Sequence, residues 1–283
     1  PPKGAKVLNL LWVYTAKPDD KGKLKSIKAR LPLQGTRNHV TLDDVSKGKA
    51  YSPVLLAISL RIMVAVTIQD PQARLWQLDI ECAYVTALCR RELWVWNPQG
   101  RGHPKKARQV LKALYGDPES GRTFYDDLMS FHLELGFQKM HHDQCLLVFY
   151  KSSREWIRCG WHVDDGAFAQ KGEDLWKWYL CRLREKYFYT LEPLTHFCGV
   201  NYHINYECGI VRIEQTALIE KGLRDIFKRE NLKSARYPVN NKVPQPSKLD
   251  IPDVVDSEVA DFPMKKAVGY TTYVHACSRP DLG

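Results

Sequence analysis

Two adjacent aspartates, Asp164 and Asp165, have the setting in this 283-residue sequence that most favours chemistry. An apolar, β-prone run from Trp156 leads into them, Gly166 follows, and a second apolar run ends at Gln170. This pattern predicts a β-hairpin with an acidic turn. Neighbouring carboxylates at the tip of a buried hairpin repel each other and are costly to desolvate, and a divalent cation would remove that cost. A solvated turn is the alternative, as it is for the Asp-Asp pairs at 19–20, 43–44 and 126–127.

Asp79 is the natural third carboxylate, because it stands near the end of an apolar run that predicts a strand over residues 73–80. If this strand lies beside the hairpin in one sheet, Asp79 comes close to Asp164 and Asp165. Metal-dependent phosphoryl transfer needs two or three carboxylates around two ions about 4 Å apart. Aspartates at strand ends are common, so the spacing alone is a weak signal.

The elements around these residues follow from periodicity and turn signals. We expect strands at 7–16, 23–33, 92–96 and 145–150, two or three short strands within 195–213, and helices at 53–68, 120–135, 173–186, 215–230 and 265–277, with 81–88 as a helical continuation. The strands at 7–16 and 23–33 are expected to form a hairpin rich in lysine, either a solvated edge or a finger that closes over phosphate. Residues 233–263 hold five prolines and are expected to form an extended loop. Helices mixed with antiparallel strands, without regular βαβ units, indicate an α+β fold.

Composition places the chain among ordinary globular proteins, with 44% hydrophobic and 26% charged residues. A net charge of +10 favours a polyanionic partner, either nucleic acid or an acidic membrane surface. Lys105, Lys106, Arg108 and Lys112 form one basic patch. The eight scattered cysteines include no C-x-x-C pair, which indicates buried free thiols in a reducing compartment. The run His141-His142-Asp143 looks metal-like, but neighbouring side chains on a strand point to opposite faces.

No part of the sequence predicts a membrane span or a signal peptide. The longest apolar run, residues 54–68, is interrupted by Arg61 and is too short to cross a bilayer. The chain begins Pro-Pro-Lys and ends Pro-Asp-Leu-Gly, which leads us to expect an excised fragment of a longer protein.

A series of short motifs, in order along the chain, resembles the reverse transcriptase domain of copia-type LTR retrotransposons. The blocks are Lys28-Ala29-Arg30-Leu31, Tyr51-Ser52-Pro53-Val54, Ser59-Leu60-Arg61, Gln77-Leu78-Asp79-Ile80 with Ala83-Tyr84, Leu111-Lys112-Ala113-Leu114-Tyr115-Gly116, Leu135-Gly136-Phe137 with Asp143 and Cys145, His162-Val163-Asp164-Asp165, Phe197-Cys198-Gly199-Val200, Gln215 to Leu223, and Ser278-Arg279-Pro280-Asp281. Each is modest alone, and their order makes the resemblance specific.

The resemblance implies a right-hand polymerase fold with an antiparallel palm sheet packed on helices. Fingers would comprise residues 1–55 and 87–122, palm 56–86 and 123–206, and thumb 207–283. The implied activity is RNA-directed DNA polymerase, or reverse transcriptase, which extends a primer 3′-hydroxyl with dNTPs. It would use two Mg²⁺ ions, with Mn²⁺ as a substitute, on a template–primer of RNA or DNA.

The family's functional residues carry over to matching positions of this sequence. The resemblance makes Asp79, Asp164 and Asp165 the catalytic, metal-binding carboxylates, with the Ile80 carbonyl as a backbone ligand. Nucleotide binding falls to five residues, of which Tyr84 would exclude the ribose 2′-hydroxyl: Arg30, Lys28, Lys17, Tyr84 and Glu119. Primer positioning falls to four others: Trp161, His162, Phe197 and Gly199. The basic surface would hold the template–primer backbone without reading sequence.

Several residues depart from the family pattern. His162 replaces a tyrosine, Glu119 stands where the family has a glutamine, and Asp117-Pro118, Gly121 and Pro32-Leu33-Gln34 also differ. The departures at His162 and Glu119 motivate one alternative, a catalytically decayed nucleic-acid-binding copy of the fold. An unrelated metal phosphohydrolase that uses the same carboxylates is another. The family also implies no membrane partner, a downstream RNase H domain in the parent polyprotein, and a cytoplasmic virus-like particle with nuclear entry.

Overall fold

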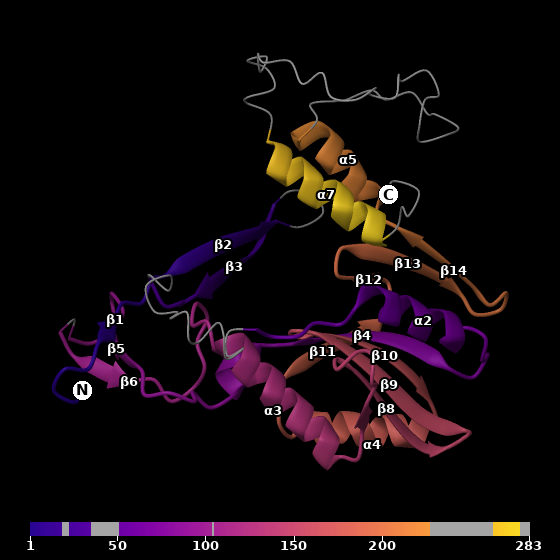
Figure 1. Cartoon of the computed structure of the whole chain (residues 1–283), viewed down its shortest axis with the longest axis horizontal. Coiled ribbons are helices and arrows are strands. Elements are labelled where there is room, and N and C mark those ends of the chain that lie inside the picture. The colour runs from indigo at the N-terminus through magenta and orange to yellow at the C-terminus, as the bar shows by residue number, and fades with distance from the viewer. Residues whose placement is uncertain (19–22, 35–50, 104, 227–262, 278–283) are drawn as a thin grey trace, which may run out of the picture. The chain divides into compact units, whose positions relative to one another are not determined.

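The computed structural model describes residues 1–18, 23–34, 51–103, 105–226 and 263–277 (Figure 1). The chain forms two compact units, Pro1–Leu194 and Thr195–Gly283. Helices and antiparallel sheets occur together, as the α+β prediction requires. None of the described helices is both long and apolar enough to span a membrane.

A six-stranded antiparallel sheet is the centre of the first unit. Its strands are β11 (Tyr189–Pro193), β4 (Arg74–Ile80), β10 (Asp165–Lys171), β9 (Glu155–His162), β8 (Leu146–Ser152) and β7 (Gln138–Lys139), in that spatial order. The hairpin predicted from the sequence is β9–β10, and the predicted strand 73–80 is β4. Strand β10 lies between them, so the sheet brings together the segments that the sequence analysis singled out.

Helices cover both faces of this sheet (Figure 1). Helix α2 (Ala57–Thr67) packs on β4, β9 and β10. Its approach needs small residues, since a Cβ on Gly160 would lie 2.6 Å from the Leu55 side chain just before the helix. Helix α4 (Glu173–Arg184) covers the other face, where Phe168 contacts Trp176 and Tyr179. Helix α3 (Ser120–Glu134) packs on the short 3-10 helix η2 (Ala83–Thr86).

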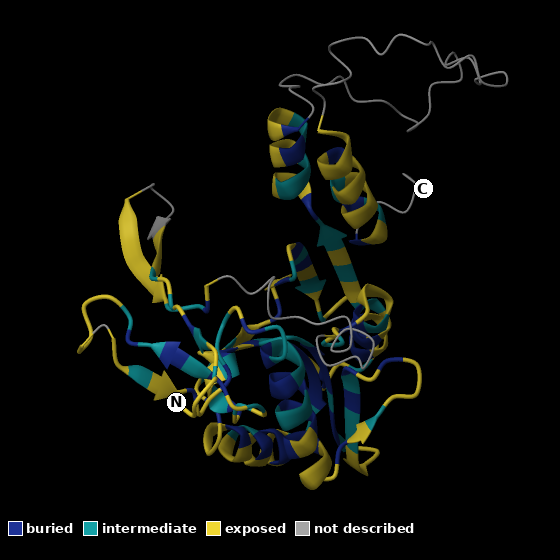
Figure 2. Cartoon of the chain, turned by 60° about the vertical axis from the view of Figure 1, so that its left-hand side comes forward, coloured by how far each residue is buried: buried dark blue, intermediate teal, exposed yellow. Residues whose placement is uncertain are grey.

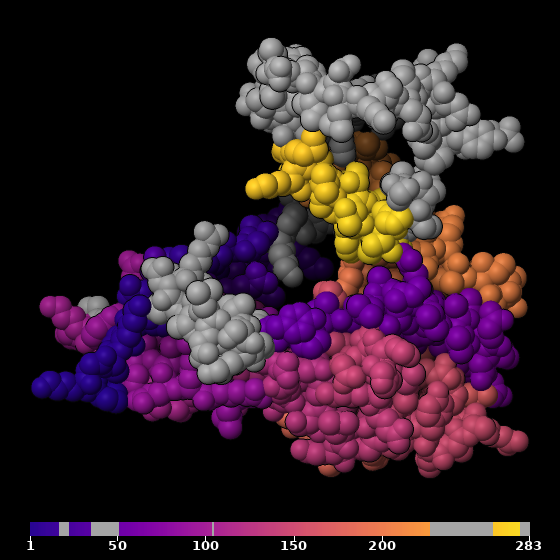
Figure 3. Space-filling model, in the orientation of Figure 1, coloured from indigo at the N-terminus to yellow at the C-terminus, as the bar shows by residue number. Residues whose placement is uncertain are grey.

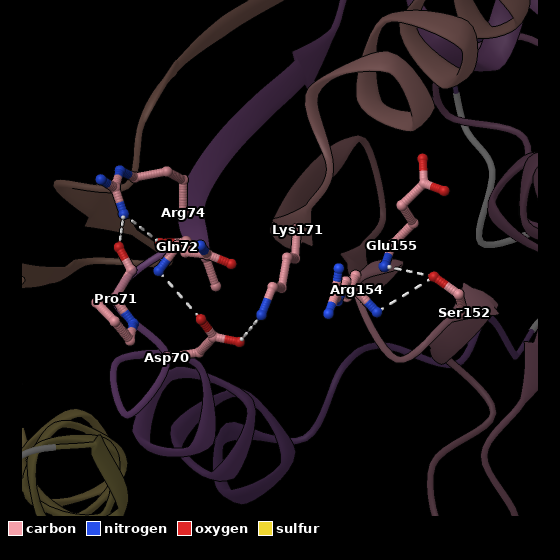
Figure 4. A network of polar contacts seen from close by, with 9 residues as sticks. Asp70, Pro71, Gln72, Arg74, Ser152, Arg154, Glu155 and Lys171 are labelled. Atoms are coloured by element: carbon pink, nitrogen blue, oxygen red, sulfur yellow. Dashed lines mark hydrogen bonds and ion pairs between the residues drawn. The ribbon is translucent and has the colours of Figure 1, made fainter.

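The end of the sheet away from the aspartates is tied by a polar network (Figure 4). Lys171, the last residue of β10, forms an ion pair with Asp70 at 2.7 Å, and this hydrogen bond lowers the pKa of Asp70. The Arg74 guanidinium donates to the Pro71 carbonyl at 2.7 Å. In the β8–β9 turn, the Ser152 hydroxyl accepts from the backbone of Arg154 and Glu155. These contacts fix the strand ends opposite the acidic turn.

A small three-stranded sheet forms from β1 (Val7–Leu8), β5 (Trp94–Trp96) and β6 (Ala107–Gln109). One face of it builds a separate core from the side chains of Leu8, Leu33, Leu93, Val95 and Val110. The expected single strand over 7–16 is wrong, because Val7–Leu8 pairs with β5 and a different strand, β2 (Val13–Pro18), pairs with β3 (Leu24–Arg30). Every β3 residue is exposed, as the yellow hairpin in Figure 2 shows.

The second unit contains β12 (His196–Phe197), β13 (Val200–Asn205), β14 (Ile210–Glu214), α5 (Thr216–Asp225) and α7 (Met264–Cys277). The short strands predicted within 195–213 are confirmed. The helix predicted at 265–277 is confirmed as α7, and the helix predicted at 215–230 is α5, which ends at Asp225. The turn at 19–22, most of the loop at 233–263 and the block Ser278–Asp281 lie outside the described residues.

The cysteine prediction is half correct. All eight thiols are free, but only Cys145, Cys159 and Cys277 are buried. Asp143, in the metal-like run, has a structural task instead. Its carboxylate accepts hydrogen bonds from the backbone N–H groups of Leu56 and Cys145, both at 2.9 Å, which secures the segment before α2.

Candidate active site

The register of β4 and β10 places Asp79 directly opposite Asp165. On its other side, Asp165 is paired with His162 of strand β9. Residues paired in this way project from the same face of a sheet. His162, Asp165 and Asp79 therefore form a row across three strands, on the face that also carries Gly160 and α2.

Asp164 is fixed to β4 through the backbone. Its carbonyl accepts a hydrogen bond from the Ile80 N–H at 3.0 Å, while Ile80 itself is buried and paired with Tyr189 of β11. Asp164 and Asp165 are half-buried and Asp79 is exposed. The three predicted carboxylates therefore come from one end of two adjacent strands, as the sequence analysis expected.

The turn between β9 and β10 contains only Val163 and Asp164. Val163 has φ +61°, a left-handed conformation that is unusual for a β-branched residue. Tight hairpin turns that require positive φ at the first central position favour glycine there. Residues held in such conformations store about 1–3 kcal/mol of strain and cluster at functional sites. The strained backbone of Val163 therefore lowers the stability of the folded chain at the acidic turn.

Two tyrosines lie beside the acidic turn. The rings of Tyr84 and Tyr115 are 4.7 Å apart, and Tyr84 also meets Phe124 edge-on at 6.2 Å. Burial raises the pKa of both phenols, and the negative charge of Asp164 raises each further. Both side chains are therefore within electrostatic reach of the Asp164 carboxylate. Tyr115 belongs to the Leu111–Gly116 motif, but its proximity to Asp164 depends on tertiary packing, which the sequence does not reveal.

Arg30 also comes into this neighbourhood. Its positive charge acts to lower the pKa of Tyr115, against the effect of burial. Arg30 and Lys28 are exposed and lie two residues apart on β3, on one face of the hairpin. Position 17 pairs with Ser26 on the partner strand, and the Lys17 side chain lies outside the described structure.

A glycine joins the hairpin base to the segment that carries Tyr115. Gly116 has φ +84°, and a Cβ there would lie 2.8 Å from the Leu33 carbonyl oxygen. The Leu33 N–H donates to the Tyr115 carbonyl at 2.8 Å. Glycine is thus required where residue 116 approaches the Leu33 backbone, and the Leu33–Tyr115 hydrogen bond brings the segment just after β3 to Tyr115.

Glu119 and Asp117 lie at the start of α3. Glu119 is the half-buried N-cap residue, without a side-chain capping bond. Asp117 is buried and forms an ion pair with Arg91. The departure at Asp117 therefore has a structural partner, which sequence reasoning missed because Arg91 is 26 residues away.

Two of the predicted primer-positioning residues differ in exposure. His162 is half-buried, and burial lowers its pKa while Asp164 acts in the opposite direction. Trp161 is only 1% exposed and its ring contacts those of His132 and Phe168. The Trp161 side chain therefore supports the hairpin from the core, which is not the primer-facing position expected for it.

Phe197 and Gly199 belong to the second unit. Phe197 is buried, and Gly199 has φ +73° in the turn between β12 and β13. The Gln215 amide donates to the Gly199 carbonyl at 3.2 Å, and the Tyr273 hydroxyl donates to the Cys198 carbonyl. Two elements thus hold this turn in place within the second unit.

The donor chemistry at the acidic turn suits a hard divalent cation, because carboxylate oxygens are the preferred ligands of Mg²⁺. Within the described part of the chain, no three Asp, Glu, His or Cys side chains are gathered into a metal-binding group. The backbone therefore brings the carboxylate-bearing positions together, while their side chains are not drawn into a ligand cluster.

Comparison with known proteins identifies the class of protein that this fold and site define. Residues 1–240 match the family "Reverse transcriptase (RNA-dependent DNA polymerase)". Because the match covers most of the chain, the chain belongs to that reverse transcriptase family, and its resemblance to copia-type elements is confirmed.

The individual relatives are Pol polyproteins of retrotransposons. The chain is 25% identical over 99% of its length to the "Retrovirus-related Pol polyprotein from transposon TNT 1-94" of Nicotiana tabacum, and covers 21% of that protein. It is 26% identical over its whole length to the transposon RE2 polyprotein of Arabidopsis thaliana, of which it covers 19%. It is 24% identical over 98% of its length to the "Transposon Ty1-BL Gag-Pol polyprotein" of Saccharomyces cerevisiae, of which it covers 16%. The chain thus spans about a fifth of the length of these relatives.

Proposed function

We propose that this chain is an RNA-directed DNA polymerase that extends a primer 3′-hydroxyl with dNTPs. The observation that carries the proposal is the antiparallel pairing of Asp79 in β4 with Asp165 in β10. The backbone hydrogen bond from the Ile80 N–H to the Asp164 carbonyl adds the third aspartate. In the reaction the primer 3′-oxygen bonds to the α-phosphorus of the nucleotide, and the bond from that phosphorus to the β-phosphate oxygen breaks, releasing pyrophosphate. Family membership supports this assignment.

Asp79, Asp164 and Asp165, with the Ile80 carbonyl, are the residues that would hold two Mg²⁺ ions. When bound, such ions activate the attacking hydroxyl and neutralise charge on the transferred phosphate and the leaving group. The three carboxylates themselves are expected to repel one another when no cation is present. Mn²⁺ is expected to substitute, because it also favours oxygen ligands.

Nucleotide recognition falls to the residues beside the acidic turn. Arg30 and Lys28, on one face of the exposed hairpin, would contact the triphosphate, and the guanidinium can do so with two parallel hydrogen bonds. Tyr84 would exclude a ribose 2′-hydroxyl with its ring. Lys17 and Glu119 are kept as nucleotide-binding candidates from the family resemblance.

His162 is the side chain best placed to touch the primer end, because it shares a sheet face with Asp165 and Asp79. Its lowered pKa favours the neutral imidazole at neutral pH, which avoids placing a cation within a metal site. Phe197 and Gly199 stay primer-positioning candidates by resemblance.

The larger assignments rest on the family. We propose the right-hand arrangement with fingers at 1–55 and 87–122, palm at 56–86 and 123–206, and thumb at 207–283. A downstream RNase H domain, and location in a cytoplasmic virus-like particle with nuclear entry, are proposed for the parent polyprotein in the same way.

Primer extension on an RNA template with a DNA primer tests the proposal. The parent chain is compared with Asp164→Asn, in Mg²⁺ and separately in Mn²⁺. Extension by the parent and its loss in the variant are expected. Template–primer binding without extension in either metal would favour a decayed binding copy, and phosphodiester cleavage without extension would favour a phosphohydrolase.

A further inference from the structure

The edge of the six-stranded sheet is only partly covered on the α4 side. Helix α2, purple in Figures 1 and 3, lies along one side of the sheet, and α4 lies on the opposite side. Helix α4 packs on β9 and β10, whereas β11 is the edge strand, two strands beyond β10. Tyr189 and Leu191 of β11 project from one face, and the Tyr189 hydroxyl donates to the Leu180 carbonyl of α4 at 3.1 Å. Both β11 side chains are only half-buried, so this edge presents an apolar surface beside the helix.

A cavity of about 460 Å³ lies between α4 and β11. Its volume is within the range of small-molecule sites, which is about 300–1,000 Å³. Three half-buried residues form its apolar wall: Leu180, Tyr189 and Leu191. Three exposed, charged residues border that wall: Lys177, Arg184 and Glu185. An apolar hollow with a few polar groups is the usual setting for a small ligand.

Arg184 is the residue among these three that has no carboxylate partner in the described part of the chain. Lys177 lies 3.6 Å from the Glu173 carboxylate, and Glu185 forms an ion pair with Arg182 at 2.8 Å. Both of these charges are therefore compensated within or next to α4. The cavity keeps one positive charge that is not neutralised, and Arg184 carries it.

The Arg184 guanidinium lies against an aromatic ring of the cavity. It is 5.1 Å from the centre of the Tyr189 ring, which is a cation–π contact. Burial raises the pKa of Tyr189, and the positive charge of Arg184 acts against that rise. Because the Tyr189 hydroxyl donates its proton to the Leu180 carbonyl, it cannot also donate to a ligand. A guanidinium has five N–H donors, so Arg184 is the group of this wall that can bind an anion.

We propose that this cavity binds a small amphiphilic carboxylate, with its apolar chain on Leu180 and Leu191 and its carboxylate paired with Arg184. A guanidinium binds a carboxylate through two parallel hydrogen bonds, and the apolar wall removes the chain from water. A nucleoside triphosphate is disfavoured, because its remaining charge would be desolvated against that wall. Asp79 pairs with Thr190 and so projects from the opposite face of the sheet. The inference therefore does not rest on the proposed function.

Isothermal titration calorimetry with sodium octanoate, without dNTPs or divalent metal, tests the proposal. Saturable binding of one octanoate per chain is expected. Octanol has the chain without the charge, acetate has the charge without the chain, and each is expected to bind about 10-fold more weakly or less. Absence of octanoate binding would overturn the proposal, as would equal affinity for octanoate and octanol.

A pair of arginine variants tests the anion contact. Arg184→Gln is expected to weaken octanoate binding about 10-fold or more, since hydrogen bonds between charged groups are stronger than those between neutral groups. Arg158→Gln is the matched control, because Arg158 also lies over an aromatic ring, that of Trp156 at 4.1 Å, but outside the cavity. It is expected to bind like the parent. Circular dichroism confirms folding, and an Arg184→Gln variant that binds octanoate like the parent would contradict the assignment.

The Cys181 thiol, which is free, exposed and part of the cavity lining, reports where octanoate binds. Octanoate at ten times its dissociation constant is expected to slow alkylation of Cys181 by iodoacetamide about 10-fold, because mass action leaves few cavities empty. Cys208, an exposed thiol of the second unit, is expected to react at an unchanged rate. Mass spectrometry of the peptides measures both rates. An unchanged rate at Cys181, or equal slowing at both thiols, would place the binding elsewhere and overturn the proposal.

Discussion

Asp79 and Asp165 face each other across the antiparallel ladder of β4 and β10, although 85 positions separate them in the sequence. The hydrogen bond from the Ile80 N–H to the Asp164 carbonyl adds the third carboxylate to the same strand end. The backbone therefore brings three carboxylate-bearing positions to one end of two adjacent strands.

Replacement of Val163 by glycine is expected to leave the free energy of unfolding equal or higher. The strain at φ +61° is relieved, and this offsets the roughly 0.5–1 kcal/mol that glycine loses in backbone entropy. Urea unfolding measures the difference. Val148→Gly, in β8 and also half-buried, is the control and is expected to lose about 1 kcal/mol or more. Equal destabilisation of the two variants would show that the turn is not strained.

Replacement of Gly166 by alanine is expected to destabilise the chain by about 1–3 kcal/mol. The new Cβ would lie 2.7 Å from the Phe168 ring and 2.8 Å from the Trp161 ring, both of which are buried. The midpoint of thermal unfolding reports the loss. Gly269→Ala, in α7 with no atom within 4 Å of the added methyl group, is expected to be neutral or stabilising. A Gly166→Ala variant as stable as the parent would contradict this packing.

His132 makes the folded chain sensitive to mild acid. Its ring is fully buried between the Leu128 carbonyl and the Tyr179 hydroxyl, and burial lowers its pKa to about 4. The folded pKa is below the unfolded value near 6.5, so the stabilisation is complete above that value and is lost as the pH falls from about 6.5 towards 4. At pH 5 the expected loss is about 2 kcal/mol in urea unfolding.

The variant His132→Phe removes this titration and serves as the comparison for that loss. Its free energy of unfolding is expected to change less between pH 7.5 and pH 5 than that of the parent. Identical pH profiles for the two chains would exclude His132 as the cause. The result bears on the site because the His132 ring contacts Trp161, which precedes His162 in β9.

Loss of the Tyr84 ring is expected to relax discrimination between sugars. In Tyr84→Ala the ratio of ribonucleotide to deoxyribonucleotide incorporation is expected to rise about 10-fold or more, because the ring would no longer fill the space of the 2′-hydroxyl. Tyr84→Phe keeps the ring against Tyr115 and Phe124 and is expected to retain the parent ratio. An unchanged ratio in Tyr84→Ala would place the ring outside the nucleotide site.

The acidic hairpin and its partner strand were predictable because their signals are local. The apolar runs around Asp164-Asp165 and before Asp79 each specify a strand, and burial inside one sheet follows from their composition. The same continuous apolar composition explains why Trp161 was expected to face the primer although its side chain lies in the core. A strand buried on both faces has a nearly continuous apolar sequence, so periodicity does not tell which of Trp161 and His162 faces the core.

The division of residues 7–16 between two sheets could not be predicted from local pattern. Val7–Leu8 and Val13–Pro18 are both β-prone, and their partners, Trp94–Trp96 and Leu24–Arg30, are chosen by tertiary pairing. The ion pair of Asp117 with Arg91 depends in the same way on contacts between distant segments. Tyr115 lies in a recognisable sequence motif, but its proximity to Asp164 results from tertiary packing and could not be predicted from that motif.

The rate of single-nucleotide incorporation on an RNA template with a DNA primer tests the central claim most directly. The parent is compared with Asp79→Asn, Asp165→Asn and the control Asp174→Asn, which lies on the exposed first turn of α4. We predict that the parent and Asp174→Asn incorporate at the same rate, and that Asp79→Asn and Asp165→Asn lose about 100-fold or more while still binding template–primer. Incorporation by either of these two variants at the parent rate would contradict a catalytic site at the Asp79–Asp165 pair.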